Sequence, residues 1–101
     1  MHHSDATLYR QCHTAALDAL RLTIDAGEGE ARRERITLLV DTADICRTAA
    51  DFVQRGSAHQ GAVARACAAV CRACREMCEA SGESALEAVV KACRAVEGIS
   101  S

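Results

Sequence analysis

The sequence is poor in the residues that build sheets, tight turns and large aromatic cores. Among its 101 residues, Tyr9 and Phe52 are the only aromatic ones, and proline and tryptophan are absent. These absences exclude collagen-like and proline-rich chains. They also disfavour a β-sandwich, whose strands and turns use aromatic, β-branched, glycine and proline residues. An alanine-rich chain without proline is instead typical of helices.

Long apolar runs and an excess of one charge are also absent. No apolar run reaches the roughly 18 residues of a membrane span. The formal net charge of −2 provides no basic surface of the kind that nucleic acids bind. The first five residues, Met-His-His-Ser-Asp, lack the apolar stretch of a signal peptide. We therefore expect a cytoplasmic protein with reduced thiols that binds neither membranes nor nucleic acids.

Cysteine is the residue that the chain has in unusual supply. There are seven cysteines, and this odd number would leave one unpaired in a closed disulfide framework. Reduced thiols, available for packing or for a metal, are therefore the better interpretation. No nucleophile with a base and an oxyanion site is recognisable, and the Glu-x-x-His repeat of di-iron bundles is missing. We expect no enzymatic activity.

Weak breaks divide residues 1–101, which we expect to form a single domain, into four helical segments. These segments span roughly 5–26, 31–54, 58–80 and 83–97. Gly27 suits a C-terminal cap of the first segment, and Ser57 suits an N-cap of the third. Short connections between long helices make neighbours antiparallel. The predicted fold is therefore all-α, an antiparallel up-down-up-down four-helix bundle.

Apolar residues recur at steps of three and four in every segment, which places them on one inward-facing stripe, here called the seam. The predicted seams are Leu8, Cys12, Ala15, Ala19, Leu22 and Ala26 in the first segment, Ile36, Leu39, Ala43, Cys46, Ala50 and Val53 in the second, Ala64, Cys67, Cys71, Cys74 and Cys78 in the third, and Leu86, Val89, Cys93 and Val96 in the fourth. All seven cysteines thus fall on seams.

The third segment carries the strongest metal-binding pattern, C-x3-C-x2-C-x3-C, formed by Cys67, Cys71, Cys74 and Cys78. Residues three and four apart are neighbours on a helix, so thiolates spaced by four can hold one ion between them. A disulfide within such a pair would be strained. Soft thiolates in an apolar channel favour Cu(I), with zinc as the second choice. The competing interpretation is that these cysteines are small apolar core residues.

Helical rise predicts where the thiols meet. At about 1.5 Å per residue, one cysteine layer receives side chains from all four helices near the middle of the bundle. Its expected members are Cys12, Cys46, Cys67, Cys71 and Cys93. Cys74 and Cys78 are expected nearer to Ser81, facing Leu22, Ile36 and Leu86.

Several motifs of the sequence resemble those of a known protein family. The four-cysteine helix, Cys46 within Ala-Asp-Ile-Cys, the Phe-Val-Gln-Arg-Gly-Ser turn at 52–57 and the helix of Cys93 resemble cysteine-rich four-helix-bundle copper-binding proteins. These include the bacterial cytosolic copper storage proteins. The resemblance covers nearly the whole chain, and it implies a homotetramer of bundles whose thiolates bind Cu(I) inside.

The same resemblance marks this chain as a cysteine-depleted member. Copper storage proteins carry many more cysteines, whereas alanine occupies seam positions here at Ala15, Ala19, Ala43 and Ala50. The predicted function is low-capacity Cu(I) binding and sequestration by the seven cysteines. A degenerate, metal-free relative that serves as an oligomeric structural or interaction module is the alternative, and a thiol redox sensor is a third hypothesis.

Histidine, methionine and arginine residues are given simpler interpretations. His13 is assigned to the surface or an interface, His59 to an exposed helix start, and Met77 to packing, while a ligand role for these histidines and for His2 and His3 is left open. The arginines at 32, 33 and 35 alternate with glutamates, which is typical of a solvated helix face.

Overall fold

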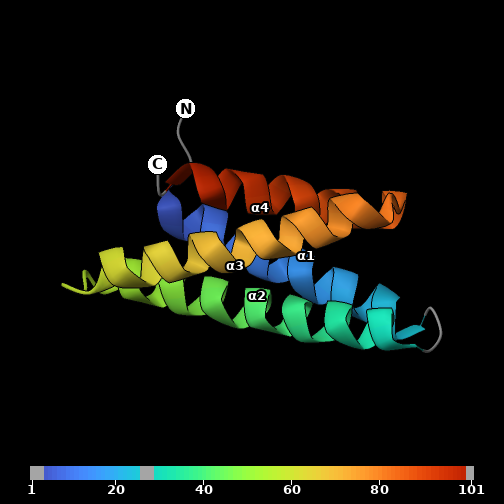
Figure 1. Cartoon of the computed structure of the whole chain (residues 1–101). Helices are drawn as coiled ribbons and strands as arrows, with labels where there is room; N and C mark the ends of the chain where they lie inside the picture. The colour runs from blue at the N-terminus through green and yellow to red at the C-terminus, as the bar shows by residue number, and fades with distance from the viewer. Residues whose placement is uncertain (1–3, 26–28, 100–101) are drawn as a thin grey trace.

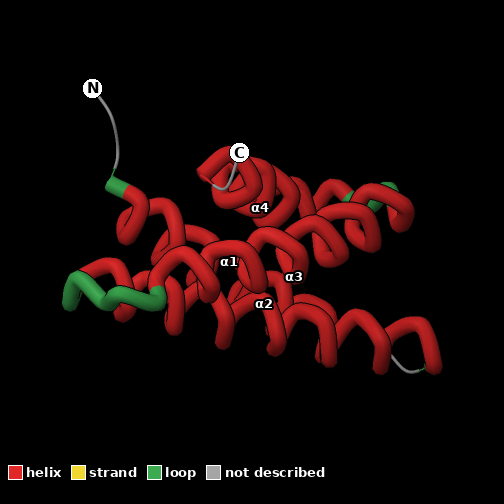
Figure 2. The backbone as a smooth tube through the Cα atoms, turned by 60° about the vertical axis from the view of Figure 1, so that its left-hand side comes forward, coloured by secondary structure: helices red, strands yellow, loops and turns green. Residues whose placement is uncertain are grey.

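Helix dominates the fold, as the alanine-rich and proline-free composition predicts. The computed structural model describes residues 4–25 and 29–99, and within these ranges it contains no strand (Figure 2). The elements are α1 (Asp5–Asp25), α2 (Glu30–Gln54), α3 (Gln60–Ser81), the 3₁₀ turn η1 (Ser84–Leu86) and α4 (Glu87–Ile99). The predicted all-α fold class is confirmed.

The four α-helices form a closed ring. α1 packs on α2, α2 on α3, α3 on α4, and α4 returns to α1. Successive helices run in opposite directions, so the beginning of α1 and the end of α4 lie at the same end of the molecule (Figure 1). The ring measures 41 × 25 × 19 Å. We call the side-chain-filled space that the four helices enclose the lumen.

Left-handed glycines reverse the chain at two turns. Gly56, with φ 65°, follows α2, and Gly82, with φ 68°, caps the C-terminus of α3. The Gly82 N–H donates to the carbonyl oxygen of Glu79 at 3.2 Å. Glycine adopts this backbone region without the steric cost that a Cβ atom brings. Both turns are therefore short enough to keep consecutive helices in contact.

One predicted helix start is wrong. The N-cap of α3 is His59 and the helix begins at Gln60, whereas Ser57 was expected at the cap. The Ser57 hydroxyl instead accepts the His59 backbone N–H at 3.1 Å, so it stabilises the turn before the helix. The predicted cap Gly27 and the seam residue Ala26 lie outside the described residues.

The predicted seams of α2, α3 and α4 face the lumen, but that of α1 is shifted. Leu22 has half of its surface exposed (50%), so it lies outside the lumen and does not face Cys74 and Cys78. The buried residues of α1 are Ala6, Tyr9, Cys12, Ala16, Ala19 and Thr23. The pattern from Tyr9 also steps by three and four, and burial of its large ring selects this stripe over the one through Leu8.

Ion pairs tie the helices together on the outside. Arg75 of α3 donates to Glu97 of α4 at 2.7 and 2.9 Å, and Arg10 of α1 pairs with Asp51 of α2 at 3.0 Å. Arg35 was expected on a solvated face, but its side chain is only 17% exposed and pairs with Glu83 at 3.0 Å. Within the described ranges, no helix combines the length and apolar character needed to cross a membrane.

The corrected α1 face can be tested by two leucine truncations. Leu39 is fully buried, so Leu39→Ala should lower the free energy of unfolding by about 2–5 kcal/mol. Leu22→Ala removes the same atoms from an exposed site and should cost about 0.5 kcal/mol or less. Urea denaturation of the metal-free, reduced protein measures both values. Equal losses would contradict the placement of Leu22 outside the lumen.

Candidate metal centre

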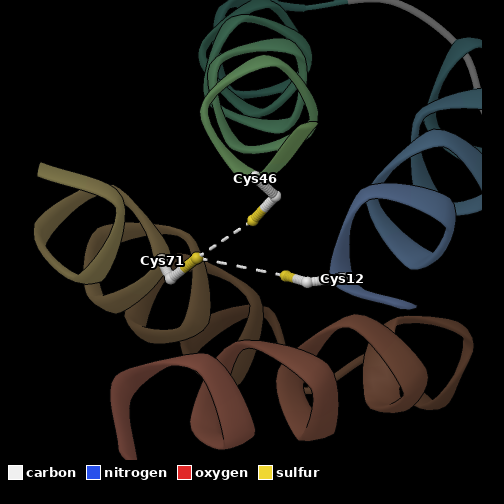
Figure 3. A group of neighbouring side chains, drawn as sticks. All are labelled: Cys12, Cys46 and Cys71. Atoms are coloured by element: carbon white, nitrogen blue, oxygen red, sulfur yellow. Dashed lines mark hydrogen bonds between the residues drawn. The ribbon is translucent and has the colours of Figure 1, made fainter. Parts of the chain in front are cut away.

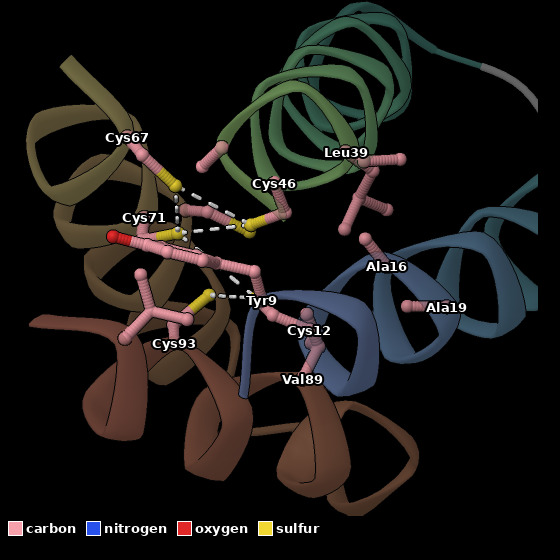
Figure 4. Close-up of a cluster of buried hydrophobic side chains, with 14 of the residues drawn as sticks. Tyr9, Cys12, Ala16, Ala19, Leu39, Cys46, Cys67, Cys71, Val89 and Cys93 are labelled. Atoms are coloured by element: carbon pink, nitrogen blue, oxygen red, sulfur yellow. Dashed lines mark hydrogen bonds between the residues drawn. The ribbon is translucent and has the colours of Figure 1, made fainter. Parts of the chain in front are cut away.

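Five thiols from all four helices meet in the lumen, as the helical rise predicts. The Sγ–Sγ distances are 3.6 Å from Cys46 to both Cys67 and Cys71, 3.9 Å from Cys71 to both Cys67 and Cys12, and 3.8 Å from Cys12 to Cys93. We call these five residues the cysteine cluster. All five are free thiols that are inaccessible to solvent (Figure 4).

Two triangles of sulfur atoms share one edge within the cluster. Cys12, Cys46 and Cys71 have their sulfur atoms within 4.8 Å of one another and point to a common centre from α1, α2 and α3 (Figure 3). Cys46, Cys67 and Cys71 form the second triangle, with edges of 3.6, 3.6 and 3.9 Å. Cys46 and Cys71 therefore belong to both triangles, and Cys71 is the central member of the cluster.

These spacings match those of sulfur atoms around one metal ion. With a metal–sulfur bond of about 2.3 Å, the sulfurs of a trigonal site lie about 4.0 Å apart and those of a tetrahedral site about 3.8 Å apart. The measured distances of 3.6 to 3.9 Å differ from these by a few tenths of an ångström. The protein fold thus holds the thiols close to a metal-binding arrangement, and little movement is needed to admit an ion.

The remaining two cysteines extend the cluster along α3. Cys74 lies close enough to Cys78 and Cys93 for both to influence its pKa. Cys78 lies nearest to the turn that follows α3, close to Arg35 and Glu83. Both thiols are buried, as expected from their seam positions. Together with the cysteine cluster, they bring seven buried thiols to the lumen.

Hydrogen bonds distribute the protons of the cluster unequally. Interactions with Cys46 and then Cys71 lower the pKa of both Cys12 and Cys67. The pKa of Cys46 and that of Cys71 are raised, first by their hydrogen bonds to Cys12 and then by those to other cluster members and by burial. The thiolate is the form that binds metals, so the direction of these shifts favours Cys12 and Cys67 over Cys46 and Cys71 as the first thiols to lose a proton.

Outside the cluster, hydrogen bonds from neighbouring thiols and then burial raise the pKa of the two remaining cysteines. Cys78 lowers the pKa of Cys74, but Cys93 and burial outweigh this and raise it to about 12. The interaction with Cys74 and burial raise the pKa of Cys78, and the positive charge of Arg35 acts in the opposite direction. A metal that binds here must therefore displace protons.

Tyr9 and Thr42 contribute to the site although no motif marks them. The Tyr9 ring extends from α1 across the cluster towards α3 (Figure 4), and burial raises the pKa of its hydroxyl to about 12. Thr42 is fully buried beside Cys74, and its hydroxyl donates to the Leu38 carbonyl at 2.7 Å. Tyr9 lies three residues before Cys12, and Thr42 lies four residues before Cys46. This spacing puts each of them on the same helix face as its cysteine, and it is the sequence signal that could have found them.

The other candidate ligands do not join the cluster. Nδ1 of the half-buried His13 lies 2.8 Å from the carbonyl oxygen of Ala43. His59 is exposed at the start of α3, and Met77 is half-buried against the core. His2 and His3 lie outside the described residues. The centre is thus built from sulfur.

The raised pKa values predict that alkali destabilises the metal-free protein. Between the ordinary pKa of 10.0 and about 12, the folded state retains the Tyr9 proton and the unfolded state loses it. Stability is therefore complete below pH 10 and falls through this interval, by about 1.4 kcal/mol per pH unit for one group. Tyr9→Phe should remove this part of the slope in urea denaturation between pH 9 and 12. An unchanged slope would contradict the burial of the phenol.

Comparison with known proteins agrees with this geometry. No curated protein and no solved structure gave a significant match to the chain. The family of copper storage proteins, however, matches over residues 2–99, a range that includes all four helices and every cysteine. The chain belongs to the copper storage protein family.

Proposed function

We propose that this chain binds Cu(I) through lumen thiolates and sequesters it in the cytoplasm. The observation that carries the proposal is the meeting of five buried thiols from four helices, with neighbouring sulfurs 3.6 to 3.9 Å apart. Membership in the copper storage family supports copper as the metal. Seven free thiols also fit a reducing compartment.

The donor set favours Cu(I) over zinc. Structural zinc sites need four ligands in a tetrahedron, whereas the group of ligating atoms found within 4.8 Å of one another consists of three thiols. Cuprous ions are soft and accept two or three thiolates. Within residues 4–25 and 29–99, no imidazole or carboxylate joins this group of sulfur atoms, and it is such harder donors that favour other metals.

The structure supports a low capacity. Two sulfur triangles share the Cys46–Cys71 edge, which provides for about two ions in the cluster. Alanines occupy the buried positions at which further thiols would enlarge it. These are Ala16 and Ala19 on α1 and Ala43, Ala49 and Ala50 on α2. We therefore propose Cys12, Cys46, Cys67, Cys71 and Cys93 as the first class of ligands, with Cys74 and Cys78 as additional ones.

A homotetrameric assembly is the second part of the proposal, carried over from the family resemblance. Apolar side chains remain on the outer surface at Leu17, Leu22, Ile24 and Val40, each more than one third exposed. Leu17 and Ile24 are seven residues apart and therefore share one face of α1. Such a face supports contact between copies. It is equally compatible with the metal-free interaction module, so metal binding itself must decide between the two hypotheses.

Removing the central thiol should abolish the tight sites. Cys71→Ala opens both triangles and should reduce the copper bound tightly by about two ions per chain, whereas Cys67→Ala opens one triangle and should cost about one. Titration of Cu(I) into the reduced protein against a chromophoric chelator measures these numbers. Fewer than one tight ion in the unmodified protein would exclude the proposed function.

Copper should also stabilise the fold. A ligand at one hundred times its dissociation constant adds about 2.7 kcal/mol when it binds the folded state alone, so Cu(I) should raise the melting temperature clearly. A variant with alanine at Cys67, Cys71, Cys74 and Cys78 is the control, and copper should no longer shift its melting temperature. Equal melting with and without copper in both proteins would favour the metal-free module.

A further inference from the structure

The lumen thiols reach a surface pocket at one end of the bundle. Cys78 lines a pocket of about 460 Å³ between the end of α3, the following turn and the start of α4. This volume is within the range of small-molecule sites, about 300–1,000 Å³. Cys78 is itself only 2% exposed, so its sulfur lies at the base of the pocket rather than on an open surface. Among the pockets lined by described residues, this is the one in which we find a cysteine.

Beneath the pocket, neighbouring thiols lead from Cys78 towards the cysteine cluster. Cys78 and Cys74 are one helical turn apart on α3, which makes them neighbours. Cys74 interacts with Cys93 of α4, and Cys93 lies 3.8 Å from Cys12 in the cluster. A cuprous ion can therefore move from the pocket to the cluster by exchanging one thiolate for the next.

The opposite end of the lumen is closed. Beyond the cluster, towards the turn between α2 and α3, Tyr9 is 1% exposed and both Ala50 and Val96 are fully buried. The Tyr9 ring extends across the cluster (Figure 4). Side chains packed in this way leave no room for a metal complex. The Cys78 end is therefore the accessible one.

Charges of both signs around the pocket suit a zwitterionic carrier of the metal. Arg35 lies close to Cys78, and its buried Nε atom has no hydrogen-bond partner in the described structure. The guanidinium also pairs with Glu83 at 3.0 Å through its Nη1 atom. Of the charged residues in the wall, Glu79 pairs with Arg94 and Glu83 pairs with Arg35. Glu87 and Lys91, four residues apart on α4, remain to match the ammonium and carboxylate groups of a small peptide.

We propose that this pocket receives Cu(I) from a complex with a small peptide thiol, and that Cys78 is the first acceptor. This inference rests on the proposed function. In the transfer step, a bond forms between copper and the Cys78 sulfur while the bond from copper to a donor sulfur breaks. The Cys78 proton passes to the departing thiolate, and copper remains in the +1 state throughout. Repetition of this exchange at Cys74 and Cys93 brings the ion to the cluster.

Transfer kinetics test the acceptor. With Cu(I)–glutathione as the donor, Cys78→Ala should lower the second-order rate of transfer by about tenfold or more, because the positioned first ligand is lost. Leu17→Ala, on the exposed face of α1 and away from every thiol, should transfer copper at the unmodified rate. Lys91→Ala should raise the donor concentration that gives half the maximal rate.

Several outcomes would overturn the inference. An unchanged transfer rate in Cys78→Ala would exclude Cys78 as the acceptor while leaving the proposed function intact, and an unchanged half-saturating concentration in Lys91→Ala would exclude docking of the carrier in the pocket. Failure of the unmodified protein to bind copper in the chelator titration would instead reject the proposed function itself.

Alkylation provides a readout that needs no metal. Limited treatment of the reduced, metal-free protein with iodoacetamide, followed by peptide mass spectrometry, should modify Cys78 before Cys71, because Cys78 lines the pocket and the pKa of both thiols is raised. Earlier modification of Cys71 would show that reagent reaches the cluster by another way, and would contradict the proposed route.

Discussion

Close packing of four helices around small side chains is the constraint on which the rest of the structure depends. Alanine and cysteine fill most of the buried positions, so the helices approach closely and the seam residues of all four meet at the centre. Under this constraint, thiols placed at matching heights must come into contact. Sulfur–sulfur distances of 3.6 to 3.9 Å follow from the backbone arrangement, and the cluster needs no special loop or turn to form it.

Periodicity was sufficient to predict the fold class and the convergence of five thiols, because both depend on helical rise and on which stripe faces inward. It was not sufficient for α1, where two stripes step by three and four and the burial of Tyr9 decides between them. The predicted start of α3 was also wrong, because the Ser57 hydroxyl forms its hydrogen bond within the preceding turn and does not cap the helix. Long-range partners such as Arg35 and Glu83 require the tertiary arrangement and leave no periodic signal.

The two ends of the lumen differ in ways that fit loading and retention. One end is closed by Tyr9 and Val96, which are almost fully buried, and the other presents Cys78 at the base of a pocket. Between them, hydrogen bonds from neighbouring thiols lower the pKa of Cys12 and that of Cys67, which favours loss of their protons when a metal binds. The same low exposure that disfavours nucleophilic chemistry at these thiols protects a bound soft ion from solvent.

The central claim is that the cysteine cluster holds Cu(I) through sulfur alone. X-ray absorption spectroscopy at the copper edge of the loaded, reduced protein tests it most directly. The account predicts a cuprous edge, a first shell of two or three sulfur atoms at about 2.3 Å, and a second shell from a neighbouring copper that shares the Cys46–Cys71 edge. A first shell of nitrogen or oxygen atoms, as surface histidines or carboxylates would give, would contradict the account.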